Sequence, residues 1–103
     1  MQLKYGKQGG VLRVALSGEL DQHAAAPLRE KLDALIAEGA DRIEFDMGGV
    51  NFMDSAGVGV ILGRYRNIRR RGGSFCVSGA KGSVDKVLRM SGVYSLCTER
   101  GGK

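Results

Sequence analysis

The sequence predicts a small α/β sandwich, in which a mixed β-sheet packs against helices. Two observations lead to this class: a pair of short alternating segments near the N-terminus is typical of a β-hairpin, and βα repeats follow it. The resulting order, ββαβαβαβ, implies a sheet that is parallel in its later part, with right-handed crossovers. Because 103 residues suit one core, we expect a single domain over 1–103 with a polar tail at about 99–103.

The first half of the chain supplies the hairpin and one helix. Segments 2–7 and 11–17 alternate apolar and polar residues on either side of a glycine-containing turn. The following helix should begin around 23–26, because Pro27 is best tolerated in a first turn, and it should end at Gly39. Its apolar stripe has helical spacing and consists of Leu28, Leu32, Leu35 and Ile36.

The middle of the chain predicts a strand, a loop and a second helix. Segment 42–47 alternates apolar and polar residues and predicts a strand, whereas the glycines of 48–53 predict a loop. Segment 54–71 predicts a helix, because its apolar residues recur at helical spacing. These residues are Val58, Ile61, Leu62, Tyr65 and Ile68.

The last third predicts one more strand, helix and strand. Segment 74–78 is a short apolar run of the kind found in buried parallel strands. A third helix is expected at about 82–91, with Ser83 as its cap and Gly92 as its stop. A final short strand is expected near 95–98.

Composition excludes several classes of protein. No apolar run approaches the roughly 20 residues needed to cross a bilayer, and the N-terminus lacks the apolar region of a signal peptide, so we expect a cytoplasmic protein without a membrane partner. In that compartment Cys76 and Cys97 are expected to be reduced, buried apolar side chains. His23 is the only histidine and the cysteines form no CxxC pair, so we expect neither a metal nor a cofactor.

Arginines near the end of the second predicted helix account for much of the net charge of +5. Cations at this end complement the negative end of the helix dipole. Apart from Tyr65, no aromatic residues alternate with them, as a stacking surface for bases requires. We therefore interpret them as a solvated helix end and expect no direct nucleic-acid contact. The arginines are Arg64, Arg66, Arg69, Arg70 and Arg71.

The Asp54–Ser55 pair opens a helix that its own composition weakens. Each glycine within a helix costs about 1 kcal/mol relative to alanine, and this helix contains Gly57, Gly59 and Gly63. Ser55 follows a parallel strand, at the end where α/β sheets tend to present functional groups, and the free N–H groups of a first turn favour an anion. Asp54 or Ser55 also suits the N-cap position, which needs no function.

Two kinds of chemistry fit this pattern poorly. A hydrolase nucleophile would need the G-x-S-x-G elbow, but Met53 stands where the first glycine belongs, and the only available base is His23. The glycine spacing also matches neither the dinucleotide-binding fingerprint nor a phosphate-binding loop. We therefore expect that the chain is not an enzyme.

A third interpretation is a modifiable serine on a docking surface. Ala56 and Gly57 leave little side-chain bulk beside Ser55, so a partner could approach it closely, whereas Gly59 and Gly63 would admit the sheet or a neighbouring helix. A phosphate on Ser55 would add a charge of about −1.5 to −2, which a helix start accommodates. At an interface next to an acidic residue, the same phosphate would oppose binding.

Several stretches of the chain resemble a known family. The segments SGELDQHAAAPLREKL (17–32) and FMDSAGVGVILGRY (52–65) are similar to the anti-sigma factor antagonists of the STAS domain family, most of all to their sporulation branch. RMSGVYSL (89–96) resembles the family's third helix and following strand, and the likeness runs from about residue 3 to 98. The resemblance implies a STAS-like fold and a transcription regulator that works by partner switching.

The resemblance also implies partners and site residues. In that family the unphosphorylated antagonist binds an anti-sigma factor, which is also a serine kinase of the histidine-kinase-like ATPase type, and the sigma factor is released. By resemblance, this kinase phosphorylates Ser55 and so ends binding, and a PP2C-type phosphatase resets the protein. The resemblance places Asp21 and Asp54 at the docking face, although Asp21 also suits the cap of the first helix. With Ala56 and Gly57, which leave little side-chain bulk beside Ser55, they make up the expected docking site.

The chain departs from the family in three respects. It ends soon after the last expected strand, it is basic where relatives tend to be acidic or neutral, and Pro27 is unusual in its helix. The first two bear on the identity of the partner more than on the fold. The basic surface and the anion-favouring helix start support an alternative, in which a STAS module senses a nucleotide or small anion, or acts as a scaffold, without a phospho-switch.

Overall fold

The computed structural model describes residues 1–98, and the predicted tail at about 99–103 lies outside the described residues. Strands and helices alternate along the chain after an initial pair of strands. The strands are β1 (Gln2–Gln8), β2 (Val11–Leu20), β3 (Arg42–Met53) and β4 (Ser74–Ser78), and the helices are α1 (Gln22–Ala37), α2 (Ser55–Arg70), α3 (Gly82–Met90) and the 3-10 helix η1 (Val93–Leu96).

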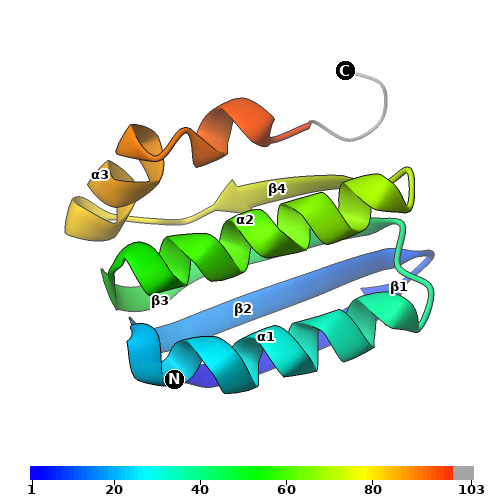
Figure 1. The fold of residues 1–103 in the computed structure, drawn as a ribbon, viewed down its shortest axis with the longest axis horizontal. Coiled ribbons are helices and arrows are strands. Elements are labelled where there is room, and N and C mark those ends of the chain that lie inside the picture. The colour runs from blue at the N-terminus through cyan, green and yellow to red at the C-terminus, as the bar shows by residue number, and fades with distance from the viewer. Residues whose placement is uncertain (99–103) are drawn as a thin grey trace.

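The four strands form one sheet in the order β1-β2-β3-β4 (Figure 1). β1 pairs with β2 in antiparallel orientation, whereas β2 with β3 and β3 with β4 are parallel pairs. The predicted mixed sheet, with a hairpin followed by βα repeats, is therefore confirmed. In this arrangement the C-terminal ends of β2 and β3 are neighbours, and the helices that follow both strands begin at the same end of the sheet.

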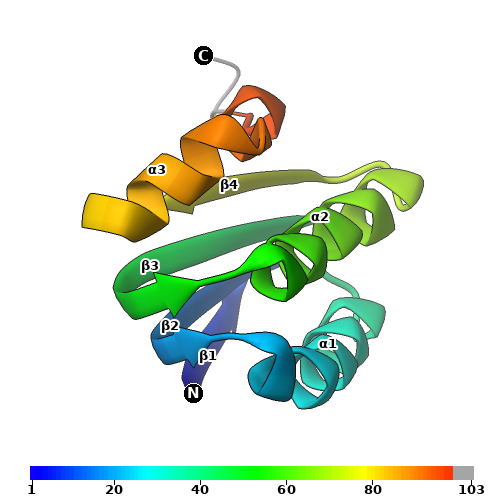
Figure 2. The same cartoon turned by 60° about the vertical axis from the view of Figure 1, so that its left-hand side comes forward.

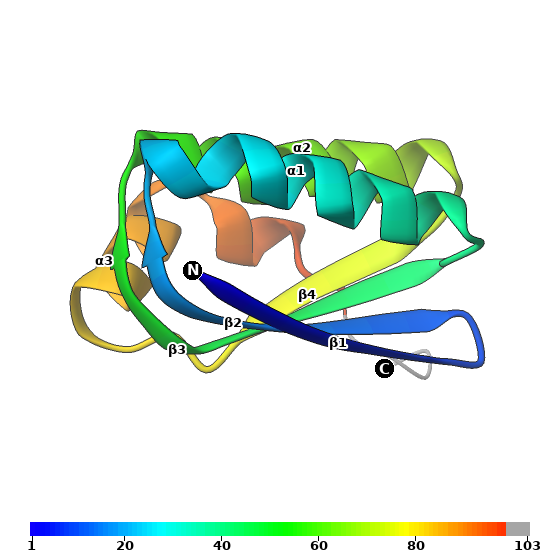
Figure 3. The same cartoon turned by 90° about the horizontal axis from the view of Figure 1, so that it is seen from below.

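Helices α1 and α2 cover one face of the sheet, so the molecule has two main layers (Figure 3). Along β2, Leu12, Val14 and Leu16 are buried, whereas Arg13 and Ala15 between them are exposed. This alternation follows from the strand period of two, with one face of the sheet packed and the other in water. α3 packs against β3 and η1 against β4, and both contribute side chains to the same core.

α1 and α2 lie side by side on the covered face (Figures 1 and 2), and polar contacts join them. Asn67 donates a hydrogen bond of 2.8 Å to the carboxylate of Asp33, and Arg64 Nε forms an ion pair with the same oxygen at 2.9 Å. Burial lowers the pKa of the Arg64 guanidinium, and the charge of Asp33 opposes this shift. The prediction that Arg64 belongs to a solvated helix end is wrong, because it is only 5% exposed.

β3 is longer than the sequence predicts. A loop was expected over 48–53, but the strand continues to Met53, because its pairing with β2 resumes beyond a β-bulge at Ser17–Gly49 and another near Gly18. Gly49 makes this close pairing possible, since a Cβ there would lie 2.6 Å from the Cβ of Ser17. The expected loop is therefore wrong, and the paired strand delivers Asp54 directly to the start of α2.

Two helix starts also differ from the prediction. α1 begins at Gln22, so Pro27 lies inside the helix beyond its first turn, and the start expected around 23–26 is slightly late. The carboxylate of Asp21 explains the earlier start, because it caps the first turn ahead of the proline. Ser83 is not the cap of α3: the cap position is Lys81, which makes no side-chain capping bond.

The final strand predicted near 95–98 is wrong, because this segment forms η1. Gly92 adopts a left-handed conformation, with φ of 82°, which ends α3 and reverses the chain. Ser95 then bonds back to the Gly92 carbonyl through both its backbone N–H (3.2 Å) and its hydroxyl (2.7 Å), which closes a tight turn. Beyond η1, the segment contacts β4 in two places: the Thr98 N–H donates a hydrogen bond of 2.9 Å to the Phe75 carbonyl, and the Val77 N–H donates one of 3.3 Å to the Cys97 sulfur.

Candidate functional site

The candidate site lies where β2 and β3 end and their helices begin. Leu20 and Met53 are the last paired residues of these two parallel strands and lie opposite each other in the register. Asp21 and Asp54 follow them directly, so the starts of α1 and α2 are neighbours at one end of the sheet (Figure 1). The structure thus brings together the aspartates that the sequence separates by more than thirty residues.

Both aspartates cap their helices. Asp21 Oδ1 accepts a hydrogen bond from the N–H of Ala24 at 3.0 Å, and Asp54 Oδ1 accepts one from the N–H of Gly57 at 3.1 Å. Their backbones are nearly identical, with φ of −111° and −112° and ψ of −174° and −171°. The capping role considered for each aspartate is therefore confirmed, and Asp54 rather than Ser55 is the cap of α2. Contact of either residue with a partner stays a prediction.

Ser55 is the first residue of α2, and its side chain is exposed. Within residues 1–98, its hydroxyl has no hydrogen-bond partner, and the backbone N–H groups of Ser55 and Ala56 also donate to no acceptor. These N–H groups stand at the positive end of the helix dipole. The site therefore offers a free hydroxyl next to two donors that could satisfy an added negative group.

Gly57 is buried, and its contacts lie within the chain. A Cβ at this position would collide with the Leu20 carbonyl oxygen and would lie 2.8 Å from Leu20 Cγ. Only glycine lets the first turn of α2 pass this close to the end of β2. The prediction that Gly57 leaves room for a partner is wrong, because Leu20 already fills that room. Ala56 is half-buried and packs against the core, so it presents only part of its surface.

Gly59 and Gly63 differ from Gly57, because they face open space rather than the end of β2. A Cβ built at either position would have no described atom within 4 Å. The prediction that their smallness admits the sheet or a neighbouring helix is therefore wrong, and internal packing accounts for neither glycine. In the interior of a helix, each of them costs about 1 kcal/mol relative to alanine.

Two residues near Ser55 were not among the predicted site residues. Phe52 is 47% exposed although it is a large apolar side chain, and its partner in the register, Glu19, is also exposed. The bulge between Gly18 and Glu19 interrupts the regular alternation of the strands here. The sequence pattern did not reveal Phe52, because segment 48–53 has the composition of a loop.

A groove of about 440 Å³ runs between the start of β1 and α1. Asp21, His23 and Lys31 line it, together with apolar side chains that include Leu3 and Leu28, and Ser55 does not. No hydrogen bond among residues 1–98 links His23 to Ser55, so the geometry offers no serine–histidine pair. The same residues contain no group of three or more His, Cys, Asp or Glu side chains placed to hold a metal ion, and none of the helices there is long and apolar enough to cross a membrane.

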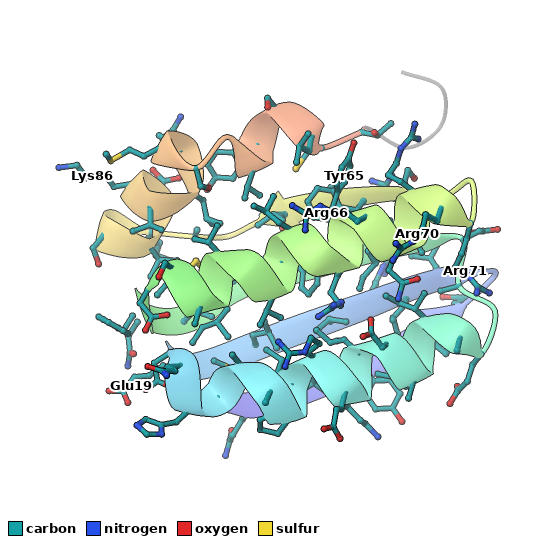
Figure 4. All side chains as sticks on the ribbon, viewed as in Figure 1. Glu19, Tyr65, Arg66, Arg70, Arg71 and Lys86 are labelled. Atoms are coloured by element: carbon teal, nitrogen blue, oxygen red, sulfur yellow. The ribbon has the colours of Figure 1, made fainter. Side chains whose placement is uncertain are left out.

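The arginines of α2 have three different environments. Arg64 is buried against α1, and Arg69 donates a hydrogen bond of 3.3 Å to the Gly73 carbonyl just beyond the helix. Arg66 and Arg70, and Arg71 just beyond the helix, are exposed, and in the described part of the chain their side chains have no ion-pair or hydrogen-bond partner (Figure 4). The solvated basic helix end that the sequence predicts therefore consists of fewer arginines, but these are unpaired.

Residues 2–98 match the model of the STAS domain family, so the chain belongs to this family. A curated relative, the anti-sigma F factor antagonist of Paenibacillus polymyxa, is 38% identical over 97 residues, which cover 93% of this chain and 83% of the relative. The anti-sigma-B factor antagonist of Bacillus subtilis is 32% identical, and the match covers 82% of this chain and 77% of that one. The family resemblance of segments 17–32 and 52–65 is thereby confirmed.

Solved structures show the same fold. The anti-sigma factor antagonist SpoIIAA in its unphosphorylated form superposes with a TM-score of 0.83 at 27% identity, covering 97% of this chain and 89% of that chain. The Bacillus cell fate determinant SpoIIAA in the phosphorylated form gives a TM-score of 0.76 at 26% identity, covering 97% and 92%. The predicted STAS-like fold is confirmed, and it is shared by both forms of that relative.

Proposed function

We propose that this chain is an anti-sigma factor antagonist, whose unphosphorylated form binds an anti-sigma factor and whose phosphorylation at Ser55 ends that binding. One observation carries the proposal: the Ser55 hydroxyl is exposed and has no hydrogen bond within residues 1–98, directly after the capping carboxylate of Asp54. The names of the relatives from Paenibacillus polymyxa and Bacillus subtilis support the class of partner. A phosphorylated and an unphosphorylated form of SpoIIAA with this fold support the switch.

The partners follow from the proposal. A serine kinase of the histidine-kinase-like ATPase type, which is the anti-sigma factor itself, transfers the γ-phosphoryl group of ATP to Ser55 Oγ, and ADP and the hydroxyl proton leave. A phosphatase of the PP2C type hydrolyses the phosphoester and restores the binding form. All three proteins act in the cytoplasm. In this account Asp21 and Asp54, with the exposed part of Ala56, border the docking surface around Ser55.

The charges around Ser55 explain how one phosphate can act as a switch. The free N–H groups of Ser55 and Ala56 can donate hydrogen bonds to the phosphate oxygens at the helix start, so the fold is retained. Toward a partner, the phosphate adds to the carboxylates of Asp54 and Asp21, and a like-charge contact of this kind can cost several kcal/mol. Since about 1.4 kcal/mol corresponds to tenfold in affinity, a single modification is enough to end binding.

The first experiment measures the site of modification. The purified chain is incubated with the anti-sigma factor of its own host and MgATP, and intact mass is read by mass spectrometry. We expect one added phosphate on the wild type and on Ser83→Ala, a matched control at an exposed serine near the start of α3. Ser55→Ala should remain unmodified. Phosphorylation of Ser55→Ala at the wild-type rate would show that the acceptor lies elsewhere.

The second experiment separates modification from docking. Calorimetry with the same anti-sigma factor should show that Ser55→Ala binds about as well as the wild type, because the exposed hydroxyl makes no hydrogen bond within residues 1–98. Ser55→Asp should bind at least about tenfold more weakly, because its carboxylate places a negative charge where the phosphate would carry about −1.5 to −2. If the two variants bind equally, charge at Ser55 does not control docking.

A further inference from the structure

One straight face of α2 connects Ser55 with the basic end of the helix. Ser55, Gly59, Gly63, Arg66 and Arg70 follow one another at helical spacings of three or four residues, so they share one side of the helix. All five are exposed or half-buried. Fifteen residues of helix rise about 22 Å, which is enough for an extended contact with another protein.

The arginines at the far end of this face have unsatisfied charges. Arg66 and Arg70 are i, i+4 neighbours of like charge, which is unfavourable in an isolated helix, and no acidic side chain of residues 1–98 pairs with either (Figure 4). Interaction with the helix dipole accounts for Arg70, which lies in the last turn. It does not account for Arg66, because the effect falls off within that turn and Arg66 lies before it.

The middle of the face is free of side chains. Gly59 and Gly63 face open space, and nothing within residues 1–98 requires glycine at either position. Together they remove the ridge that side chains would form between Ser55 and Arg66, so the backbone of another protein could lie directly against the helix. The bare stretch and the unpaired arginines therefore lie on the same face of α2.

We infer that the docking surface for the anti-sigma factor extends from Ser55 over Gly59 and Gly63 to Arg66 and Arg70, and that the partner meets the arginines with an acidic segment. The inference rests on the proposed function and adds to it a second contact, in which this chain contributes positive rather than negative charge. Around Ser55 this chain is acidic, with Asp54 and Asp21, whereas the far end is basic. The charge reversal along the face would fix the direction in which the partner lies.

Other occupants of the basic end fit less well. A single-stranded nucleic acid would need aromatic rings beside the arginines, but the half-buried Tyr65 packs against the core, with its ring centroid 5.1 Å from that of Phe75. A membrane surface would need apolar side chains between the cations, and this stretch of the face contains glycines instead. An acidic protein segment agrees with both the charge and the smooth surface.

The main test compares two double charge reversals with the same change in net charge. Arg66→Glu/Arg70→Glu removes the basic end of the face. Lys81→Glu/Lys86→Glu makes the same change in net charge at two exposed lysines, one at the cap position of α3 and one within that helix. The probe is the anti-sigma factor that phosphorylates Ser55, and affinity is measured by calorimetry at low and high salt. We expect at least a tenfold loss for the arginine pair with a weaker salt dependence, and less than a threefold loss for the lysine pair. Equal losses for the two variants would overturn the inference.

A second test separates docking from folding. Gly59→Gln/Gly63→Gln introduces two good helix formers into open space, so the melting temperature should stay the same or rise. Binding to the same anti-sigma factor should nevertheless weaken at least fivefold, because the side chains hold the partner away from the helix. Unchanged binding by this variant would show that the partner does not lie along α2.

Photo-crosslinking in the host distinguishes failure of this inference from failure of the proposed function. A photoreactive residue is placed at position 55, at position 66, or at position 86 as a control. Capture of one and the same anti-sigma factor from positions 55 and 66, but not from 86, supports the inference. Capture from 55 alone, or capture of nucleic acid, lipid or a different protein from 66, overturns it while the proposed function stands. Failure at both 55 and 66 counts against both.

Discussion

The two strand-to-helix junctions of this chain have the same geometry and different first turns. β2 leads through Asp21 into α1, and β3 leads through Asp54 into α2, with capping distances of 3.0 and 3.1 Å and almost equal cap dihedrals. After the cap, α1 continues with Gln22, His23 and Ala24, whereas α2 continues with SAG. The aspartates therefore have a structural explanation at both junctions.

Only the features that α2 does not share with α1 require a functional explanation. Capping accounts for Asp21 and Asp54 without any partner, so neither aspartate marks the site by itself. Ser55 contributes nothing to the cap, and Gly57 takes the place of Ala24 only because the Leu20 carbonyl comes close. What remains unexplained by folding is the free hydroxyl of Ser55 and the outward glycines of α2.

The largest expected effect comes from exchanging the residues at the third helical position. Gly57→Ala should destabilise the fold by about 2–3 kcal/mol, because the new methyl group meets backbone and side-chain atoms of Leu20 that cannot move without disturbing β2. Denaturant unfolding measures this loss. The reciprocal change at the other junction, Ala24→Gly, should cost only about 1 kcal/mol, the ordinary penalty of glycine in a helix. Equal losses would mean that the two first turns are packed alike.

The next effect concerns the caps. Asp21→Ala and Asp54→Ala should each lower the free energy of unfolding by about 1 kcal/mol, since each removes one capping hydrogen bond of similar length. The two losses should agree closely in urea unfolding. Asp54→Asn is the matched control, because asparagine caps a helix about as well and removes only the charge. A clear difference between the two alanine variants would show that the junctions are less alike than their geometry indicates.

The smallest effect isolates charge at the first helical position. Ser55→Asp and Gln22→Asp each place a carboxylate directly after a capping aspartate, where the helix dipole is favourable and the neighbouring charge is not. Both variants should unfold within about 0.5 kcal/mol of the wild type. Binding to the anti-sigma factor should then fall much further for Ser55→Asp than for Gln22→Asp. Large destabilisation by Ser55→Asp would remove the basis for a switch that leaves the fold intact.

The sequence predicts most of the fold, because local patterns are strong where one face of an element is buried. The alternation in 11–17 and 42–47 and the leucine stripe of the first helix each have one buried face in the structure. Segment 48–53 was predicted incorrectly, because a bulged strand with two glycines has the composition of a loop. The segment near 95–98 was predicted incorrectly because a left-handed glycine and a serine turn outweighed its apolar residues.

The candidate site was predicted in part. The position of Ser55 at a helix start follows from the order of strand, aspartate and serine, and the structure places it there. The orientation of the glycines could not be predicted, because it depends on how α2 is rotated against the sheet: Gly57 turns inward, whereas Gly59 and Gly63 turn outward. The burial of Arg64 depends in the same way on Asp33, which belongs to another helix.

The segment that follows η1 protects the sheet as well as closing the turn. β4 is an edge strand, and its outward backbone groups are occupied by the Thr98 N–H on the Phe75 carbonyl at 2.9 Å and by the Cys97 sulfur, which accepts from the Val77 N–H at 3.3 Å. An open strand edge is a template for pairing with other chains. A variant truncated after Gly92 would expose this edge, and we expect it to aggregate through added strands.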